Sequence, residues 1–307
     1  MSQIYDVIIL GAGPAGLSSA IYTGRAMLET LVLEKGVPGG QILMTDFIEN
    51  YPGFPEGIAP VELTENFRKQ AERFGAKIDI DTIKELQMEE QLWKVCGSKN
   101  EYLTRAVIIA TGANFRRLGV KGEGKLTGRG VSFCATCDGF FFRDKVVAVV
   151  GGGNWALTEA IFLTKFARQV KVIHRRDQLR AEKILQERAL AHEKIEMVWD
   201  TVIEEILGDT TLKSLSVKNV KTGELSELQV DGLFVSIGTV PNSDFVKDLL
   251  ELNEWGEIVV GKKMETAQPG IYAAGDVTDA CPEQVATAVG TGVAAAIAID
   301  EYLQSLT

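Results

Sequence analysis

Two cysteines three positions apart, Cys134 and Cys137, are the residues of this 307-residue chain best suited to chemistry. They lie in the segment VSFCATCDGFFF, just before an apolar run that predicts a strand. A C-x-x-C pair either binds a metal ion or alternates between dithiol and disulfide. A tetrahedral metal site needs two further ligands, yet there is no second C-x-x-C pair and the only histidines are His174 and His192. We therefore expect redox cycling and no metal site, with inert core cysteines as the alternative.

The other two cysteines, Cys96 and Cys281, have no partner at a fixed spacing. A lone cysteine is more often a small packed side chain than a catalyst. We expect both to be packed thiols.

A glycine-rich turn near the N-terminus predicts a dinucleotide site. Residues 5–34 read as an apolar strand, the turn GAGPAG, a helix of small residues and a second strand that ends in Glu34. In this context the first glycine makes the tight turn, the second lets a pyrophosphate approach, and the third permits close helix packing. The helix would offer its first amides to the anion and Glu34 would accept hydrogen bonds from a ribose, unless the turn is purely structural. The turn residues expected at the site are Gly11, Gly13, Pro14, Ala15 and Gly16.

The same pattern returns at residues 145–176, so the chain carries an internal repeat. Glu34 stands 23 residues after Gly11, and His174 stands 23 residues after Gly151. A basic cluster thus replaces the acid, which favours a 2′-phosphate and hence NADPH, with a solvated basic patch as the alternative. The expected binding residues are Gly151, Gly153, Asn154, Ala156, His174, Arg175, Arg176 and Arg180.

The repeat predicts the domain organisation. Each copy closes with a matching strand and glycine, at residues 107–113 and 233–239. A later strand that ends at Gly275 and Asp276 has no counterpart inside the second copy, so we assign it to the first domain. We predict an α/β fold of two Rossmann-like dinucleotide-binding domains. Each domain has three layers (ββα), and the second domain is inserted into the first. The first domain is expected at residues 1–114 and 243–307, and the second at residues 115–242.

Composition argues against several classes of protein. The 32 basic and 42 acidic side chains leave a net charge of −10, which disfavours nucleic acid as a partner. The longest apolar run, residues 285–299, is interrupted by Thr and Gly and is shorter than the ~20 residues of a membrane helix, so we predict no membrane span. The first strand begins at once near Tyr5, without an apolar leader, and this favours a cytoplasmic location.

These motifs together resemble the low-molecular-weight thioredoxin reductases, over essentially the whole chain. The resemblance is carried by GAGPAG, GGQ at 39–41, ENYPGFP at 49–55, ATGA, CATCDG, the second glycine turn, HRR with RAEKIL, and AAGDV. In that family the first domain binds FAD, the second binds NADPH, and the dithiol carries electrons from the flavin to the disulfide of thioredoxin. The resemblance therefore implies FAD and NADPH as cofactors, thioredoxin as partner, and a homodimer.

The resemblance also implies roles for single residues. Cys137 would be the thiol beside the flavin, Cys134 the thiol that attacks thioredoxin, and Asp138 the acid that protonates the departing thiolate. For Asp138 an aspartate that caps a turn is the alternative. Beyond the first glycine turn and Glu34, the implied FAD site comprises Gly39, Gly40, Gln41, Asn50, Thr111, Gly112, Gly275, Asp276, Gln284, Val285 and Ala286.

Two positions depart from the family pattern. Trp155 follows Asn154 where the family usually has a small hydroxyl residue, and Glu283 stands where an arginine usually precedes Gln284. Both lie in segments expected to bind nucleotides, so a donor such as reduced ferredoxin is an alternative to NADPH. A redox sensor that is reduced once without turnover is the second alternative.

Overall fold

The computed structural model describes residues 3–44 and 47–306, and its contacts divide the chain into two compact units. Among the described residues, unit 1 contains 3–43, Phe47–Asn114 and 240–306, and unit 2 contains Met44 and Phe115–Thr239. We predicted that the second domain extends to residue 242. Instead Asn242 belongs to unit 1, because its backbone N–H donates to Gly112 O (2.9 Å) and its side-chain amide to Thr111 O (2.9 Å).

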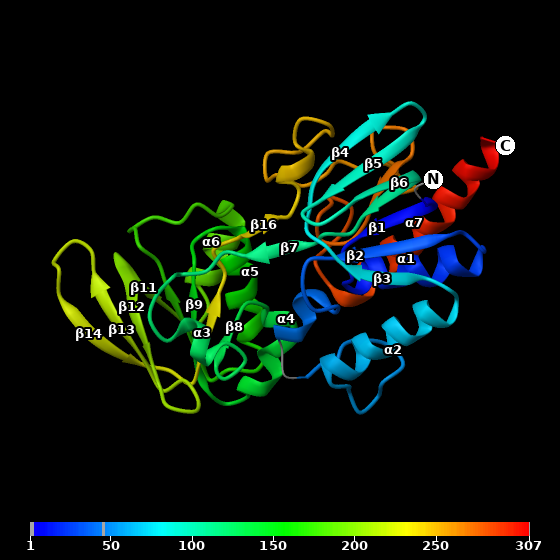
Figure 1. The fold of residues 1–307 in the computed structure, drawn as a ribbon. Helices are drawn as coiled ribbons and strands as arrows, with labels where there is room; N and C mark the ends of the chain where they lie inside the picture. The colour runs from blue at the N-terminus through cyan, green and yellow to red at the C-terminus, as the bar shows by residue number, and fades with distance from the viewer. Residues whose placement is uncertain (1–2, 45–46, 307) are drawn as a thin grey trace. The chain divides into compact units, whose positions relative to one another are not determined.

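A seven-stranded sheet forms the centre of unit 1 (Figure 1). Its order is β3-β2-β1-β6-β5-β4, and β17 pairs in parallel with the C-terminal half of β6. The strands from β3 to β6 are parallel, whereas β5 and β4 follow as an antiparallel hairpin. The strands are β1 (Ile4–Leu10), β2 (Thr30–Glu34), β3 (Lys77–Ile80), β4 (Ile83–Glu89), β5 (Leu92–Gly97), β6 (Glu101–Ile109) and β17 (Ile271–Ala273).

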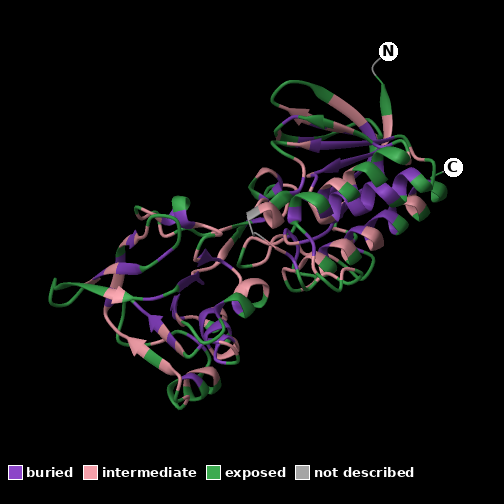
Figure 2. Cartoon of the chain, turned by 90° about the horizontal axis from the view of Figure 1, so that it is seen from below, coloured by how far each residue is buried: buried purple, intermediate pink, exposed green. Residues whose placement is uncertain are grey.

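Both faces of this sheet are covered. Val7 and Ile9 of β1 pack with the helices, whereas Ile8 and Leu10 pack on the other face with Trp93 of β5, as the two-residue period of a strand requires. The helix surfaces that face the sheet are buried (Figure 2). Unit 1 thus has the predicted layers. Its helices are α1 (Pro14–Arg25), η1 (Gly40–Met44), α2 (Pro60–Arg73), η3 (Asp244–Val246) and α7 (Val285–Ser305).

Helices α1 and α7 approach closely through small residues. Ser19 Oγ of α1 donates to Gly292 O of α7 at 2.9 Å, and a Cβ at Gly292 would lie 2.2 Å from Ala15 O. Helix α7 has 21 residues, more than the predicted apolar run. By length and composition it could cross a membrane, a test that the core helix of a soluble protein also passes. Here its small side chains serve the contact with α1.

Unit 2 repeats the layered plan. Its five-stranded sheet is parallel, in the order β11-β10-β9-β15-β8, and a separate antiparallel sheet has the order β12-β13-β14. The helices pack on one face of the parallel sheet and the antiparallel strands on the other, so the predicted two-domain Rossmann-like fold is confirmed. The elements are α3 (Glu123–Leu126), β8 (Val131–Ser132), α4 (Ala135–Asp138), η2 (Gly139–Phe142), β9 (Val146–Val150), α5 (Asn154–Leu163), β10 (Gln169–Ile173), α6 (Lys183–Leu190), β11 (Ile195–Val198), β12 (Thr201–Leu207), β13 (Ser214–Asn219), β14 (Leu225–Gln229) and β15 (Gly232–Val235).

The five parallel strands of the two units correspond in order, β3-β2-β1-β6-β17 and β11-β10-β9-β15-β8. The late strand β17 therefore has a counterpart, β8, which precedes the second repeat in the chain. The carboxyl ends of parallel strands form the edge of such a sheet at which ligands bind. Because β8 ends at Ser132, it brings Cys134 to that edge of unit 2. Where the chain crosses between the units, β7 (Ala113–Phe115) pairs with β16 (Thr239–Pro241).

Two glycines of α7 give a matched test of the α1 contact. Replacing either glycine by Ala stabilises the helix by the same difference in helix propensity, ~1 kcal/mol. At Gly292 the new methyl group meets Ala15 O at 2.2 Å, so we expect Gly292→Ala to lower the free energy of unfolding by ~1–3 kcal/mol. At Gly290 no heavy atom lies within 4 Å, so Gly290→Ala should stabilise. Urea unfolding followed by circular dichroism measures both; equal effects would contradict the close contact.

Candidate active site

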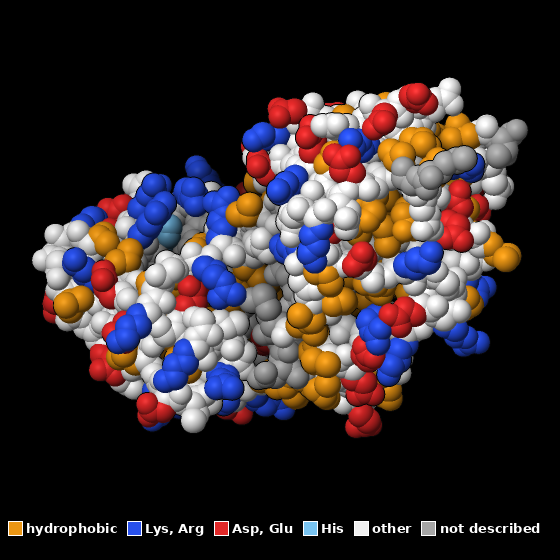
Figure 3. All heavy atoms as spheres, in the orientation of Figure 1, with side chains coloured by type: hydrophobic (Ala, Val, Ile, Leu, Met, Phe, Trp, Pro, Cys, Tyr) orange, Lys and Arg blue, Asp and Glu red, His pale blue; other side chains and the backbone are white. Residues whose placement is uncertain are grey.

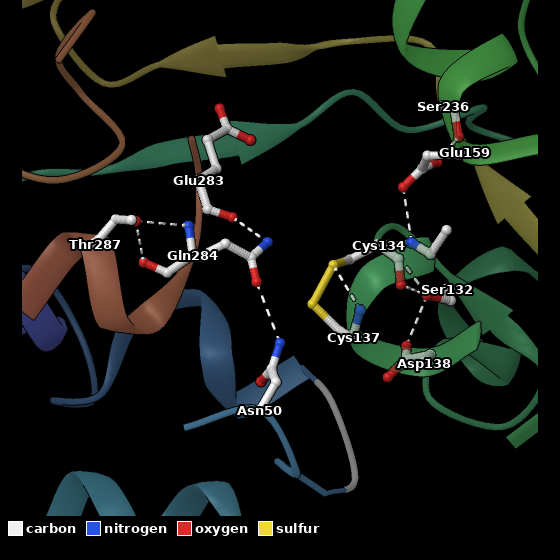
Figure 4. Close-up of a disulfide and its surroundings, with 11 residues drawn as sticks. Asn50, Ser132, Cys134, Cys137, Asp138, Glu159, Ser236, Glu283, Gln284 and Thr287 are labelled. Carbon is white, nitrogen blue, oxygen red and sulfur yellow. Dashed lines mark hydrogen bonds between the residues drawn. A yellow bond between two sulfur atoms is a disulfide. The ribbon is translucent and has the colours of Figure 1, made fainter. Parts of the chain in front are cut away.

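Cys134 and Cys137 form a disulfide at the start of α4 (Figure 4). Their Cα atoms are 5.4 Å apart, both side chains are partly exposed, and the Cys137 N–H donates to Cys134 Sγ at 3.1 Å. Within residues 3–44 and 47–306, no group of three His, Cys, Asp or Glu side chains is placed to hold a metal ion. An accessible disulfide that accepts an N–H donor at one sulfur is suited to thiol–disulfide exchange.

Asp138 follows Cys137 directly and is held by a serine that the sequence analysis did not identify. Ser132 Oγ donates to Asp138 Oδ2 at 2.6 Å and accepts from the Cys134 N–H at 3.1 Å. The serine therefore fixes the carboxyl group with respect to the backbone of the redox pair. Its position two residues before Cys134 is typical of a hydroxyl that bonds the local backbone, and this is the signal that could have found it.

Glu159 is the second residue that was missed. It lies on α5, is 6% exposed, and accepts from the backbone N–H of Ala135 at 2.7 Å. Ser236 Oγ, after β15, donates to its other oxygen. Burial raises the pKa of Glu159. A buried acid thus contacts the peptide between the first cysteine and its neighbour.

In unit 1 the first glycine turn has the predicted geometry. A Cβ at Gly16 would lie 1.9 Å from Gly11 O, so a side chain there would separate α1 from the turn. At Gly13 the nearest atom would be Gly40 Cα at 3.8 Å, so the backbone is open to a ligand. No side chain caps the N-terminus of α1, which begins at Pro14. The turn therefore fits a pyrophosphate group.

Several segments of unit 1 meet around this turn. Glu34 Oε2 accepts from Ala12 N at 2.8 Å, and Gly39 N donates to Ala12 O at 2.8 Å. A Cβ at Gly275 would lie 2.9 Å from Ala15 Cβ, which places the end of β17 against the start of α1. Sequence positions more than 200 residues apart are thus brought together, as a shared cofactor site requires.

Gln41 carries an unpaired polar atom. Its Nε2 donates to Ala113 O, but its Oε1 is buried and finds no partner among the described residues. A buried carbonyl oxygen without a donor is rare, and a bound polar group would satisfy it. The residues around the first turn therefore fit a dinucleotide such as FAD.

The remaining predicted residues of unit 1 lie in two further clusters. Asn50 Nδ2 donates to Gln284 Oε1 at 3.2 Å (Figure 4), and Gln284 caps α7, whose first residues are Val285 and Ala286. Thr111 Oγ1 donates to Asn242 O at 2.8 Å, beside Gly112. Asn242 was not predicted, since a short polar stretch gives no sign of a long-range contact.

Asp276 follows β17 and is only partly exposed. Loss of contact with water raises its pKa to about 6. A carboxyl group kept partly neutral near neutral pH can donate as well as accept a hydrogen bond. This suits contact with the hydroxyl groups of a ligand.

In unit 2 the second glycine turn is built in the same way. A Cβ at Gly151 would meet Ser236 O at 2.4 Å and Ala156 Cβ at 2.6 Å, whereas no heavy atom lies within 4 Å of a Cβ at Gly153. No side chain caps the N-terminus of α5. Asn154 exchanges hydrogen bonds with Glu182 at 2.7 and 3.1 Å and so joins the turn to the start of α6.

The basic cluster differs from the prediction at one residue. His174 is 5% exposed, its Nε2 lies 3.0 Å from Gln178 O, and burial lowers its pKa. Its ring fills the space above Gly152, where a Cβ would lie 2.2 Å from the imidazole. His174 therefore supports the turn from inside, and a neutral buried ring is unsuited to pairing with a phosphate.

The arginines, in contrast, line an open pocket. Arg175, Arg176 and Arg180 are exposed and surround a cavity of about 330 Å³ together with Lys221. Lys221 is paired with Asp177 (2.6 Å) and Asp200 (3.0 Å), whereas no carboxylate of the described chain lies within 4 Å of the three arginines. Basic side chains gather on this surface in Figure 3. The pocket fits a phosphate group.

Trp155 leaves the second turn open. The centroid of its ring lies 6.3 Å from that of Phe115, so the side chain packs within unit 2. No described heavy atom lies within 4 Å of a Cβ built at Gly153, so the indole does not cover that glycine. The departure from the family pattern is therefore compatible with a nucleotide.

The other two cysteines are partly buried, Cys96 in β5 and Cys281 before α7. Burial raises the pKa of both thiols. This lowers the fraction of reactive thiolate.

Comparison with known proteins supports the interpretation of these residues as a reactive disulfide and two nucleotide-binding turns. A family model described as pyridine nucleotide-disulphide oxidoreductase matches residues 5–292. The thioredoxin reductase of Streptomyces coelicolor is 46% identical over 310 residues, which cover 100% of this chain and 96% of that protein. That of Bacillus subtilis is 45% identical over 305 residues, with 99% and 96% covered. The solved thioredoxin reductase of Streptococcus pyogenes gives a TM-score of 0.95 at 42% identity, with 99% and 100% covered.

The raised pKa of Asp276 predicts a pH-dependent stability. The folded chain favours the neutral carboxyl, so this contribution is complete below the ordinary pKa of 3.8 and is lost as the pH rises through about 6. In protein stripped of nucleotide, Asp276→Asn should gain up to ~3 kcal/mol over wild type by pH 7.5, from ~1.4 kcal/mol per pKa unit. Urea unfolding between pH 4 and 7.5, a range that spans both pKa values, measures the gain, with Asp279→Asn, a nearby exposed acid, as control. A gain that falls with rising pH would contradict the assignment.

Proposed function

This chain belongs to the pyridine nucleotide-disulphide oxidoreductase family and, within it, to the thioredoxin reductases, and we propose that Cys134, Cys137 and Asp138 perform its reaction. The enzyme uses NADPH to reduce the disulfide of thioredoxin through FAD. The observation that carries the assignment of residues is the partly exposed Cys134–Cys137 disulfide at the ligand-binding edge of unit 2. Asp138 adjoins it.

The thiol chemistry follows from the pair itself. When bound, FAD would supply the electron pair from NADPH that, with two protons, converts the Cys134–Cys137 disulfide to two thiols. The Cys134 thiolate then attacks a sulfur of the thioredoxin disulfide, which forms a mixed disulfide and releases one thiolate of thioredoxin. Cys137 attacks Cys134 Sγ, which restores the internal disulfide and releases the second thiolate. Asp138, whose carboxyl group is held in place by Ser132, protonates a departing thiolate.

The two cofactors are assigned to the two glycine turns. In unit 1, FAD would be held by the open backbone at Gly13, the carboxylate of Glu34 and the unpaired Gln41 Oε1. In unit 2, NADPH would be held by the turn at Gly153 and by the arginine pocket, and His174 would support the turn from inside. The alternative donor, reduced ferredoxin, is not favoured, because Trp155 leaves the turn open.

We also propose that the enzyme works as a homodimer in the cytoplasm, without a membrane or nucleic acid as partner. The homodimer rests on the family resemblance. The thiols Cys96 and Cys281 suit a reducing compartment, and the net charge of −10 disfavours nucleic acid. Light scattering of the purified protein at several concentrations would test the dimer.

Anaerobic titration of the yellow protein with NADPH tests donor, cofactor and acceptor together. We expect NADPH to bleach the flavin absorbance and added thioredoxin to restore it over many cycles. Protein that takes up no FAD would overturn the assignment. A single reduction followed by arrest would instead support a sensor.

Cys134→Ser and Cys137→Ser should each abolish thioredoxin reduction, because the exchange requires two thiols to accept and pass on the electron pair. Flavin binding should be unchanged, since neither side chain lies in unit 1. Steady-state turnover and the flavin spectrum measure the two properties. Near-native turnover in either variant would show that the dithiol does not act. Cys96→Ser is the control, and it should leave turnover unaltered.

The arginine pocket predicts a preference for NADPH over NADH. Charge-assisted bonds to the 2′-phosphate contribute ~1.5–3 kcal/mol each, so Arg175→Ala and Arg176→Ala should each lower the NADPH/NADH ratio of kcat/KM by roughly 10- to 150-fold. The exposed Arg168, outside the pocket, gives the control Arg168→Ala. Equal kcat/KM for the two nucleotides in wild type would remove the argument.

A further inference from the structure

We propose that Glu159 is a positioning residue for the redox pair, which fixes the Cys134–Ala135 peptide and thereby stabilises the dithiol relative to the disulfide. The proposal rests on the proposed function of Cys134 and Cys137, and it adds a residue of α5 to their machinery. No sequence motif pointed to this residue. It follows from the contacts of one buried carboxyl group.

The first step is the contact with the redox segment. Glu159 Oε1 accepts from the Ala135 N–H at 2.7 Å, and this N–H belongs to the peptide that joins Cys134 to Ala135 (Figure 4). The orientation of that peptide sets the direction in which the Cys134 side chain leaves the backbone. With the peptide fixed, Cys134 Sγ lies 3.1 Å from the Cys137 N–H, which donates to it.

The second step is the rigidity of the carboxyl group itself. Ser236 Oγ, which follows β15, donates to its second oxygen. Glu159 is 6% exposed and Ser236 is 4% exposed, so water does not compete for these bonds. The segment after β15 therefore holds the acceptor that orients the peptide, on a carboxyl group carried by α5.

The third step is the effect on the redox equilibrium. A hydrogen bond to a thiolate is charge-assisted and roughly twice as strong as one to a neutral acceptor. The Cys137 N–H thus contributes more when Cys134 is a thiolate than when it is part of the disulfide. Loss of the Ala135 anchor weakens this alignment, and the reduced state loses more than the oxidised state.

Charge is a competing effect with the opposite sign. Removing an ionised carboxylate near the pair would favour a thiolate and hence the dithiol. Burial raises the pKa of Glu159, and this reduces the share of the ionised form and hence the effect of charge. Glu159→Gln separates the two effects, because the amide keeps an acceptor for Ala135 N–H but has no charge.

The test equilibrates the flavin-loaded full chain with reduced and oxidised dithiothreitol. Dithiothreitol gives two electrons and two protons to the disulfide, and acid quenching, alkylation and mass spectrometry count the protein thiols. We expect Glu159→Ala to shift the equilibrium constant at least tenfold toward the disulfide, equal to about 30 mV for a two-electron couple. Glu159→Gln should stay within about threefold of wild type.

Glu123→Ala is the matched control. Glu123 is also a buried acid of unit 2, 2% exposed, and it accepts from Leu118 N and Gly119 N at 2.9 Å, outside the redox segment. It should leave the equilibrium unchanged. An equal shift in Glu123→Ala, an unshifted Glu159→Ala, or equal shifts in Glu159→Ala and Glu159→Gln would each overturn the proposal.

A further variant keeps the test decisive if Glu159→Ala does not fold. Glu159→Asp retains the acid but shortens its reach to Ala135 by one methylene, so it should also shift toward the disulfide. A Glu159→Asp variant with the same thiol–disulfide equilibrium constant as wild type would contradict the proposal. Because no measurement uses NADPH or thioredoxin, failure of thioredoxin turnover in wild type would overturn the proposed function and leave this result standing.

Discussion

The short pairing of β8 with β15 is the contact on which the redox site of unit 2 depends. Only two registered pairs join them, Val131 with Leu233 and Ser132 with Phe234. Because the pairing is parallel, both strands end at the same edge of the sheet, where the glycine turn after β9 also lies. This is why Cys134, Ser236 and Glu159 meet although they are far apart in the chain. Two pairs of backbone partners thus bring the residues of the disulfide site together.

The two glycine turns show how one backbone plan is adapted to two ligands. In unit 1, Glu34 ends the second strand. Its carboxylate faces the glycine turn and accepts a hydrogen bond from Ala12 N. In unit 2 the matching residue, His174, fills the space at Gly152 and points its ring inward. Under the proposed function, the selection of a phosphate falls to the arginines that follow His174 and line the pocket.

The sequence predicted what depends on local patterns and missed what depends on single long-range contacts. The glycine turns, the two-domain fold and the C-x-x-C pair were predicted, because each requires particular residue types at fixed spacings. Strand β8 was not, since two residues are too few to show a period. The burial of His174 was missed because the glycine that accommodates its ring lies more than twenty residues away. In α7, Gly292 is one of the residues that interrupted the apolar run, and it lets the helix approach α1, whereas Thr291 accepts from Gly275 N after β17.

Glu159 shows which signal such a miss leaves in the sequence. It is an acid within the apolar segment NWALTEAIFL and shares a helix face with Ala156, Ala160 and Leu163, all of them buried. An unpaired charge on that face would be destabilising, so the position implies a polar partner from another element. Here the partners are a backbone amide of the redox segment and a serine at the neighbouring strand end. A charged residue on the buried face of a helix that follows a nucleotide turn therefore indicates a contact with the chemistry at that sheet edge, even where no motif names it.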